Sequence, residues 1–426
     1  MDKFIINGGS PLAGEVTISG AKNAVLPIMA ACIIKPGRYI INNVPNLKDT
    51  RTMISLIEES GANIEFSNNV LKVDSTTCNN PVAPYRLVKT MRASFYMLGP
   101  FMSRFNKAIV SLPGGCAWGP RPVNFHIEAL EKMGAKIELK DGNIVCKGKL
   151  KGTLIEFEKK SVGATGNIIM AAVEAEGSTE IVNAACEPEI ADLCNFIELM
   201  GVNIDGIGTD KLVIHPNSQT FDSPHVDKDV EIEYTVIPDR IEAGTFMIAT
   251  LMTKGDIILK NVNVNHLDAV IQKIKEAGGK INKISDSSMN VKYVKEIIPT
   301  DIETLEYPGY PTDLQAQWMA LMSISSGESR IVENIYKDRF THISELTRFG
   351  ADICLENNQA FINGIKSLTP APVMSTDIRA SASLILAALS ANGKSSISRI
   401  YHIDRGYEQI EKKIKSLGGD IARVSG

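Results

Sequence analysis

The sequence predicts an α/β protein of two similar halves, each built from three copies of a strand–helix–strand–helix–strand unit. Two observations support this. One pattern recurs six times: a helix-like segment ends in an apolar residue, and a glycine, then a small residue or valine, and then a short strand follow it. An apolar helix rich in small residues precedes each copy. One such unit is too small to bury its own apolar faces, so we expect three units to pack around a shared centre in each half.

The glycine of the recurring segment is expected to end a helix in every copy. EESGANIEF is the first copy and KSLGGDIAR is the last. Glycine adopts the left-handed conformation that ends many helices without steric cost. The six glycines are Gly61, Gly134, Gly201, Gly278, Gly350 and Gly418. Their regular spacing of 67 to 77 residues predicts six repeats that account for nearly the whole chain.

The small-residue helix is expected to be the buried element of each repeat. Apolar residues surround these segments instead of forming one stripe, as in helices that are buried on most sides. A glycine and a β-rich stretch such as GRYIINNV or GDIILKNV follow most of them. The six segments are residues 22–34, 92–103, 163–175, 242–252, 313–324 and 379–391. The two halves are expected to meet in the chain near residues 228–240.

The composition excludes several classes of protein. Hydrophobic residues form 44% and charged residues 22% of the 426 residues, as in globular proteins. No apolar stretch reaches the about 20 residues of a membrane-spanning helix, and the N-terminus lacks a secretory signal, so we expect a cytoplasmic protein with no membrane partner. The net charge of −4 offers no general attraction to nucleic acid. The cysteines and histidines lack the usual metal-ligand spacings, so no metal is expected.

Cations stand where several of the buried helices begin. Lys22, Arg92 and Arg379 hold such positions, and Asn23 follows the first of them. Helix N-termini attract anions, and arginine or lysine beside them strengthens the recognition of phosphate or carboxylate. If the helices of each half point the same way and the halves face each other, they form a cleft with positive potential. The alternative is that these cations are ordinary surface residues at helix ends.

Asp313 is the exception, because it places a carboxylate at the equivalent repeat position. It lies in GYPTDLQAQW, where Thr312 or Asp313 could cap the following helix. A carboxylate among cations stays ionised at neutral pH, so Asp313 could equally act as a base. The sequence leaves both interpretations open.

The segment LPGGCAWGPR, residues 112–121, predicts a surface loop that presents a cysteine. Glycine and proline fill most of residues 113–120, which excludes the interior of a helix or strand. Cys116 is therefore expected to be exposed, and the nearby Arg121 should lower the pKa of its thiol. A free thiol without a role is the alternative.

Together these segments resemble the enolpyruvyl transferases. The resemblance rests on SGAKNAVLP, MRAS, LPGGCAWGPRP, SVGAT, YPTDLQAQ, TDIRAS and YHIDRGYE, and it runs from about residue 4 to residue 422. It implies two domains, each an inverse α/β barrel of three βαβαββ-type repeats, connected by a double crossover. The first domain would be residues 21–230 and would carry the Cys116 loop. The second would be residues 1–20 and 231–426, with the active site in the cleft between the domains.

The resemblance also implies a reaction and a set of site residues. An enolpyruvyl group passes from phosphoenolpyruvate to the 3-hydroxyl of UDP-N-acetylglucosamine, without metal or cofactor, in the first committed step of peptidoglycan precursor synthesis. Lys22, Asn23, Arg121, Arg379 and Arg405 match residues that hold phosphoenolpyruvate. The matches to nucleotide-sugar contacts are Arg92, Arg121, Pro122, Val123, Asn124, Phe125, Lys160, Ser161, Val162, Gly163, Asp313 and Ile335.

Three residues are expected to move protons or form a covalent bond. Cys116 matches the acid that protonates C3 of phosphoenolpyruvate, and it can also attack C2 to give a covalent pyruvate-derived adduct. The same match implies alkylation of its thiol by fosfomycin. Asp313 matches the base for the sugar hydroxyl, and Asp377 is expected to assist removal of the C3 proton. Lys22 and Arg405 are expected to stabilise the charge of the tetrahedral intermediate.

The sequence departs from the family pattern in three places and leaves two other functions open. Trp118 replaces a residue that is usually aliphatic, Asn124 stands where aspartate is common, and Lys337 stands where glutamate is common. The first alternative function is the sister reaction on shikimate 3-phosphate, whose enzymes lack an equivalent cysteine loop. The second is an inactive regulator that binds nucleotide sugar. Such a regulator is expected to lack Lys22, Cys116, Asp313 or Arg405, and all four are present.

Overall fold

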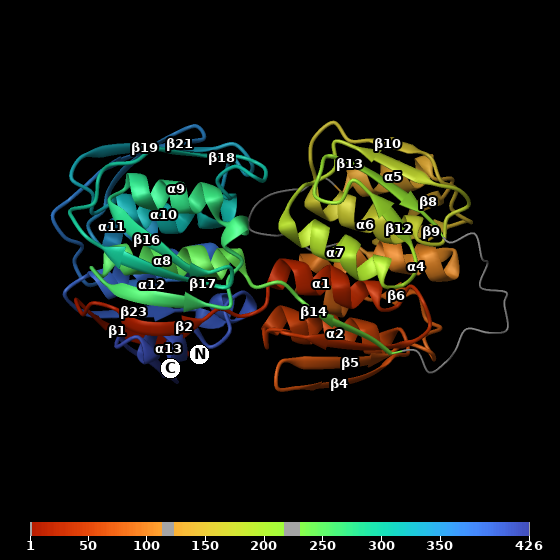
Figure 1. Ribbon diagram of the computed structural model, residues 1–426, viewed down its shortest axis with the longest axis horizontal. Helices are drawn as coiled ribbons and strands as arrows, with labels where there is room; N and C mark the ends of the chain where they lie inside the picture. The colour runs from red at the N-terminus through yellow and green to blue at the C-terminus, as the bar shows by residue number, and fades with distance from the viewer. Residues whose placement is uncertain (1, 113–122, 217–230, 426) are drawn as a thin grey trace. The chain divides into compact units, whose positions relative to one another are not determined.

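The computed structural model describes residues 2–112, 123–216 and 231–425. The chain divides into two compact units (Figure 1). The first unit is Gly20–Ile237, and the second unit combines Met1–Ser19 with Pro238–Gly426. Because the second unit takes both ends of the chain, the polypeptide passes between the units twice.

The first unit contains three repeats. The first repeat comprises α1 (Lys22–Ala31), β3 (Arg38–Asn42), α2 (Lys48–Glu59), β4 (Asn63–Ser67) and β5 (Val70–Asp74). The second comprises β6 (Val82–Ala83), α3 (Tyr85–Val88), η1 (Arg92–Met97), α4 (Leu98–Phe105), β7 (Lys107–Ser111), α5 (Asn124–Lys132), β8 (Lys136–Lys140) and β9 (Asn143–Lys147). The third comprises β10 (Leu154–Glu156), α6 (Val162–Ala172), β11 (Thr179–Val182), α7 (Pro188–Glu198), β12 (Asn203–Asp205) and β13 (Lys211–His215). The last strand of the unit is β14 (Glu231–Thr235).

The second unit repeats the plan. It opens with β1 (Lys3–Gly8) and β2 (Ala13–Thr17). The first repeat comprises α8 (Arg240–Met252), β15 (Asp256–Lys260), η2 (Val264–His266), α9 (Asp268–Glu276), β16 (Gly279–Ser285) and β17 (Ser288–Tyr293). The second comprises β18 (Ile302–Thr304), η3 (Thr312–Leu314), α10 (Gln315–Met322), β19 (Glu328–Glu333), α11 (Ile343–Arg348), β20 (Asp352–Glu356) and β21 (Gln359–Asn363). The third comprises β22 (Pro372–Met374), α12 (Ile378–Ser390), β23 (Gly393–Ser398), η4 (Ile400–Arg405), α13 (Ile410–Ser416) and β24 (Asp420–Val424).

The described strands form six four-stranded sheets, three in each unit, and all six share one pattern. In the order β10-β11-β13-β12, for example, a parallel pair is followed by antiparallel neighbours. A parallel pair needs a crossover between its strands, and α6 provides it between β10 and β11. The repeated mixed sheet confirms the predicted α/β class and the three repeats of each half.

Three strands pair with strands that lie far from them in the sequence. β2 precedes α1 in the chain but pairs in parallel with β15 of the second unit. β14 precedes α8 but pairs in parallel with β3 of the first unit. β1 lies between β23 and β24 and completes the last sheet. The division of the chain therefore falls after Ile237, because β14 belongs to the first unit.

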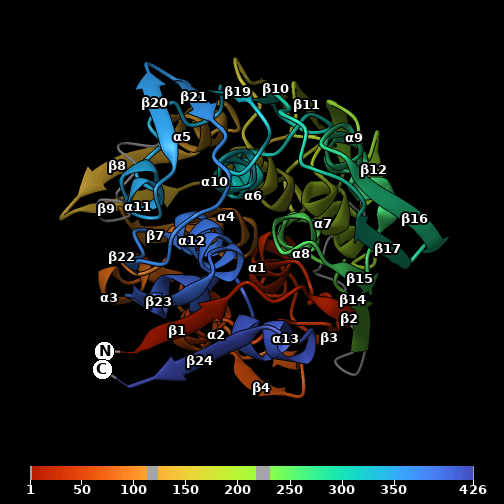
Figure 2. The same cartoon turned by 90° about the vertical axis from the view of Figure 1, so that its left-hand side faces the viewer.

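The small-residue helices are the core of each unit. In the second unit α8, α10 and α12 contact one another, and Figure 2 shows them together with strands around them. Every residue of α10 is buried, including the fully enclosed Trp318. In the first unit α4 and η1 pack against α6, and η1 also contacts α1. The prediction that these helices are buried on most sides is confirmed.

The six predicted helix-ending glycines all have positive φ, between 82° and 101°. After α5, the N–H of Gly134 donates to the carbonyl of Glu131 at 2.8 Å, and the N–H of Ala135 donates to that of Leu130 at 3.0 Å. These bonds satisfy carbonyl groups at the helix end, and an L-residue at such a φ is strained. This part of the sequence prediction is confirmed.

Candidate active site

Asp313 is held between two arginines in the second unit. It lies in η3, directly before α10. Its Oδ2 is 2.7 Å from Nη2 of Arg379, and its Oδ1 is 2.9 Å from Nη2 of Arg339. Pro311 and Leu314 are the cap positions of η3 and α10, and neither makes a side-chain cap hydrogen bond. The structure therefore favours a charge-paired carboxylate over the capping interpretation of Asp313.

The two arginines keep this carboxylate ionised. Burial on its own raises the pKa of Asp313, but the charges and hydrogen bonds of Arg379 and Arg339 hold it well below its ordinary value. The side chains of both arginines are at most 10% exposed, so water screens the interaction poorly. Asp313 is therefore a hydrogen-bond acceptor at neutral pH and a weak base.

Arg379 is positioned by the start of α12 and by a tyrosine. Asp377 is the N-cap of α12, and its Oδ1 accepts hydrogen bonds from the backbone N–H of Arg379 at 2.8 Å and of Ala380 at 3.1 Å. Nη1 of Arg379 donates to the hydroxyl of the buried Tyr407 at 3.4 Å. Asp377 thus has a structural function as a cap, and its proposed part in proton removal stays a prediction.

Arg405 and Ile335 lie on segments that other contacts hold in place. Arg405 is the last residue of η4 and is half-buried, two positions before Tyr407. Its neighbour Asp404 pairs with Arg423. Ile335 follows β19, and its backbone N–H donates to Oε1 of Glu333 at 2.9 Å. Among the predicted site residues of the second unit, Asp313 and Arg379 are in direct contact.

Lys22 begins α1 in the first unit and is buried. Its Nζ is 2.7 Å from Oδ2 of Asp49, on α2, and the two side chains are 10% and 4% exposed. Asn23 follows it on α1 and is half-buried. A buried cation is stable only with a partner of opposite charge, and α2 provides one. Lys22 is therefore not an ordinary surface cation.

The predicted nucleotide contacts at the starts of α5 and α6 adjoin each other through His126. Val123 is the N-cap of α5, and Asn124 and Phe125 are its first residues, directly before this histidine. A Cβ placed on Gly163 would stand 3.4 Å from the His126 ring, so glycine allows the close approach. His126 Nδ1 is 2.9 Å from the side-chain nitrogen of Asn167.

His126 stays neutral because of its surroundings. Burial, together with the charge of Arg92, lowers its pKa to about 3. Its ring also packs edge-on against Phe95, with ring centroids 4.8 Å apart. The histidine therefore acts here as an uncharged spacer between the two predicted nucleotide-contact segments.

The remaining predicted site residues are placed as follows. Arg92 begins η1. Nζ of Lys160 is 3.4 Å from Sγ of Cys186, and the hydroxyl of Ser161 caps α6 by accepting from the N–H of Ala164 at 3.3 Å. Val162 and Gly163 are the first residues of α6. Cys116, Arg121, Pro122 and Trp118 lie outside the described residues.

Sequence reasoning did not identify five residues that contact the predicted site residues. They are Asp49, His126, Glu333, Arg339 and Tyr407. Tyr407 lies within the motif YHIDRGYE, so its position could have identified it. Asp49 and Arg339 lie outside the quoted motifs, and only the packing of neighbouring elements brings them to Lys22 and Asp313.

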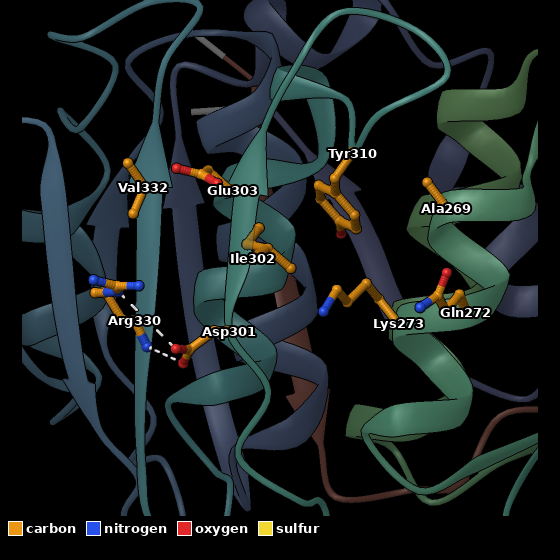
Figure 3. A pocket seen from close by; sticks show the side chains of 9 residues that line it. All are labelled: Ala269, Gln272, Lys273, Asp301, Ile302, Glu303, Tyr310, Arg330 and Val332. Atoms are coloured by element: carbon orange, nitrogen blue, oxygen red, sulfur yellow. Dashed lines mark hydrogen bonds and ion pairs between the residues drawn. The ribbon is translucent and has the colours of Figure 1, made fainter.

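A separate pocket of about 290 Å³ lies within the second unit, between α9 and the strands β18 and β19 (Figure 3). Arg330 on its wall pairs with Asp301, and Lys273 pairs with Glu276. None of the predicted site residues that the structure describes lines it. Among the described residues there is no cluster of three potential metal ligands, and no helix is long and apolar enough to cross a membrane.

The chain is similar to known proteins over its whole length. A family model described as EPSP synthase (3-phosphoshikimate 1-carboxyvinyltransferase) matches residues 6–414. The UDP-N-acetylglucosamine 1-carboxyvinyltransferase of Geotalea uraniireducens is 51% identical over 426 residues, with 100% of both chains covered. The protein of the same name from Chloroherpeton thalassium is 48% identical, with 99% of this chain and 97% of its own covered.

Solved structures share the fold at low sequence identity. The enolpyruvyl transferase NikO from Streptomyces tendae superposes with a TM-score of 0.88 at 21% identity, covering 100% of this chain and 99% of its own. EPSP synthase from Acinetobacter baumannii gives a TM-score of 0.76 at 16% identity, with 100% of both chains covered. These likenesses confirm the predicted two-part α/β fold.

Proposed function

Because the chain belongs to the enolpyruvyl transferase family, we propose that it transfers the enolpyruvyl group of phosphoenolpyruvate to the 3-hydroxyl of UDP-N-acetylglucosamine and releases phosphate. This is the first committed step of peptidoglycan precursor synthesis. The observation that carries the proposal is the identity of 48–51% to UDP-N-acetylglucosamine 1-carboxyvinyltransferases over the full chain. Both substrates are cytoplasmic metabolites, so the protein acts in the cytoplasm.

The reaction is an addition followed by an elimination. C3 of phosphoenolpyruvate gains a proton while O3 of the sugar forms a bond to C2 and loses its own proton. The resulting tetrahedral intermediate then loses a C3 proton, and the C2–O bond to phosphate breaks. Two proton positions are needed, and we assign Cys116 to C3 and Asp313 to the sugar hydroxyl. Asp377 assists the removal of the C3 proton.

The low pKa of Asp313 is compatible with its assignment as a base. A hydroxyl is far too weak an acid to give its proton to this carboxylate in the ground state. As the bond from O3 to C2 forms, the oxygen becomes positively charged and its proton becomes strongly acidic, so a weak base suffices. The ionised carboxylate orients the hydroxyl by accepting its hydrogen bond, and takes the proton only when the bond forms.

The cations hold the anionic substrate. Lys22, Arg121, Arg379 and Arg405 bind the phosphate and carboxylate of phosphoenolpyruvate, with Asn23 beside them. Arg379 also pairs with Asp313, so one guanidinium links the base to the phosphoenolpyruvate site. Fixed cations stabilise the charge that develops in the intermediate without having to reorganise. Alternatively the thiol of Cys116 adds across the C2–C3 double bond: its sulfur bonds to C2, the π bond breaks as C3 gains the proton that the thiol gives up, and the phosphate stays on C2 in the covalent adduct.

Phosphate release with each acceptor tests this proposal. We expect the full chain to release phosphate from phosphoenolpyruvate with UDP-N-acetylglucosamine, and to yield the nucleotide sugar enlarged by one enolpyruvyl group in mass spectrometry. Release with shikimate 3-phosphate alone would assign the chain to the sister reaction. Binding of the nucleotide sugar with no turnover would identify an inactive regulator.

A further inference from the structure

Glu333 is a fully buried carboxylate at the end of β19, on which four donors converge. Its Oε1 accepts hydrogen bonds from the hydroxyl of Thr304 at 2.8 Å and from the backbone N–H of Ile335 at 2.9 Å and Tyr336 at 2.8 Å. Its Oε2 accepts from the hydroxyl of Thr312 at 2.9 Å. The four donors thus occupy acceptor sites on both oxygens of this side chain.

Three of the four donors belong to two segments that carry predicted sugar contacts, and the fourth, Thr304, is the last residue of β18. Thr312 directly precedes Asp313 in η3, before α10, and Ile335 follows β19. The hydroxyl of Thr312 also accepts a hydrogen bond from Nη1 of Arg339 at 3.0 Å. Glu333 therefore connects both segments to the guanidinium that pairs with Asp313.

Nothing in the packing of the sheet requires a carboxylate at this position. In β19 the neighbouring inward residue Ile331 is apolar and pairs with Ile302 of β18. Burying a carboxylate costs free energy that only its hydrogen bonds offset. What the carboxylate provides is a fixed distance between the chain before α10 and the chain after β19.

We propose that Glu333 is a positioning residue for the acceptor sugar. It holds the Asp313 carboxylate and the Ile335 segment in one arrangement, to which the N-acetylglucosamine ring is complementary, while it leaves the uridine diphosphate contacts unaffected. The inference rests on the proposed function, because it assumes that Asp313 and Ile335 contact the sugar. Glu333 itself is buried and touches no substrate.

The test is the variant Glu333→Gln in the full chain. Glutamine keeps the size of the side chain but replaces one acceptor oxygen with a donor, so one of the converging donors loses its acceptor. We expect the affinity for UDP-N-acetylglucosamine to fall towards that for UDP, with the affinity for UDP unchanged, both measured by titration calorimetry. We expect kcat/KM for the nucleotide sugar to fall about 10- to 100-fold, as for a displaced reacting group.

A matched variant separates positioning from general loss of stability. Thr250, on α8, is fully buried, and its hydroxyl donates to the carbonyl of Phe246 at 2.8 Å. Thr250→Val therefore removes a buried hydrogen bond of the same unit outside the Glu333 network. We expect it to lower the melting temperature without changing the ratio of the two affinities.

If Glu333→Gln does not fold, Thr312→Val removes only the arm of the network that leads to Asp313, and the same selective loss is expected. Equal losses of UDP and UDP-N-acetylglucosamine affinity in the variant that is measured, or unchanged affinities and turnover, would overturn the positioning role. If the wild-type chain neither binds the nucleotide sugar nor releases phosphate, the proposed function fails, and the inference fails with it.

Discussion

The Lys22–Asp49 pair and the Asp313 cluster occupy the same place in their repeats, at the start of a buried helix, with opposite charges. At α1 the helix carries the cation and α2 provides the carboxylate. At α10 the helix start carries the carboxylate, and the cations come from Arg339 and from α12. The first arrangement pairs one cation with one carboxylate, and the second pairs two cations with one carboxylate. A repeated scaffold can thus hold either charge at a buried helix start, provided that a neighbouring element supplies the opposite one.

The largest expected effect comes from Cys116, because neither charge cluster provides a nucleophile. Cys116→Ser should abolish alkylation by fosfomycin, since a hydroxyl is a far weaker nucleophile than a thiolate. Mass spectrometry of the intact protein, with fosfomycin and the nucleotide sugar present, measures the adduct. Absence of a mass increase in the wild-type protein would contradict the assignment of the cysteine loop.

Asp313→Asn asks whether the carboxylate at α10 does chemistry or only neutralises its arginines. Asparagine keeps the shape but cannot take the proton of the sugar hydroxyl. We expect both substrates to bind and kcat to fall about 10²- to 10⁴-fold, the usual contribution of a general base. Steady-state phosphate release measures kcat, and calorimetry measures binding. Unchanged turnover would reduce Asp313 to a structural partner of Arg379 and Arg339.

Asp49→Asn tests the corresponding partner at α1. Removing one charge of a buried ion pair costs about 3–5 kcal/mol, so the free energy of unfolding of the first unit should fall by up to this amount. Urea unfolding monitored by circular dichroism measures it. The exposed pair Lys211–Glu180 serves as a control, since Glu180→Gln should have a small effect. A change for Asp49→Asn as small as the control would show that burial does not strengthen the Lys22 pair.

His126 gives the smallest expected effect, and it extends the comparison to a group that stays neutral beside a cation. A histidine with a folded pKa of about 3 stabilises the native state fully above its unfolded pKa of about 6.5, and this contribution is lost as the pH falls below that value. His126→Gln can still accept the Asn167 hydrogen bond but does not titrate.

Between pH 7 and pH 5 the wild-type protein should therefore lose about 2 kcal/mol more than His126→Gln in free energy of unfolding. Urea titrations at the two pH values measure the difference. Parallel losses in the two proteins would mean that His126 protonates in the native state with an ordinary pKa.

The repeats could be predicted from the sequence because each rests on local rules. Gly61 and its five equivalents mark helix ends by their conformational freedom alone, and the small-residue helices show by composition that they are buried. The positions of Lys22 and Asp313 were predictable for the same reason. Their partners were not, since Asp49 and Arg339 reach them only through the packing of separate elements.

The same limit explains why Glu333 was missed and why the two interpretations of Asp313 stayed open. Thr304 and Ile335 meet at Glu333 because β18 and β19 pair in parallel, a relation between strands separated by a whole helix. An aspartate directly before a helix fits both a helix cap and a catalytic base, so the sequence alone does not distinguish the two roles. Only the position of Arg379 in space distinguishes them, and α12 begins more than sixty residues later in the chain.

The placement of β1 between β23 and β24 has a consequence for synthesis on the ribosome. Residues 20–237 contain every strand of the first unit, so that unit can fold while the rest of the chain is still being translated. β1, by contrast, precedes that unit in the chain but has no strand to pair with until β23 and then β24 have been translated. The strand β1 therefore stays unpaired while the whole first unit is translated, so the second unit is begun before the first unit but completed after it.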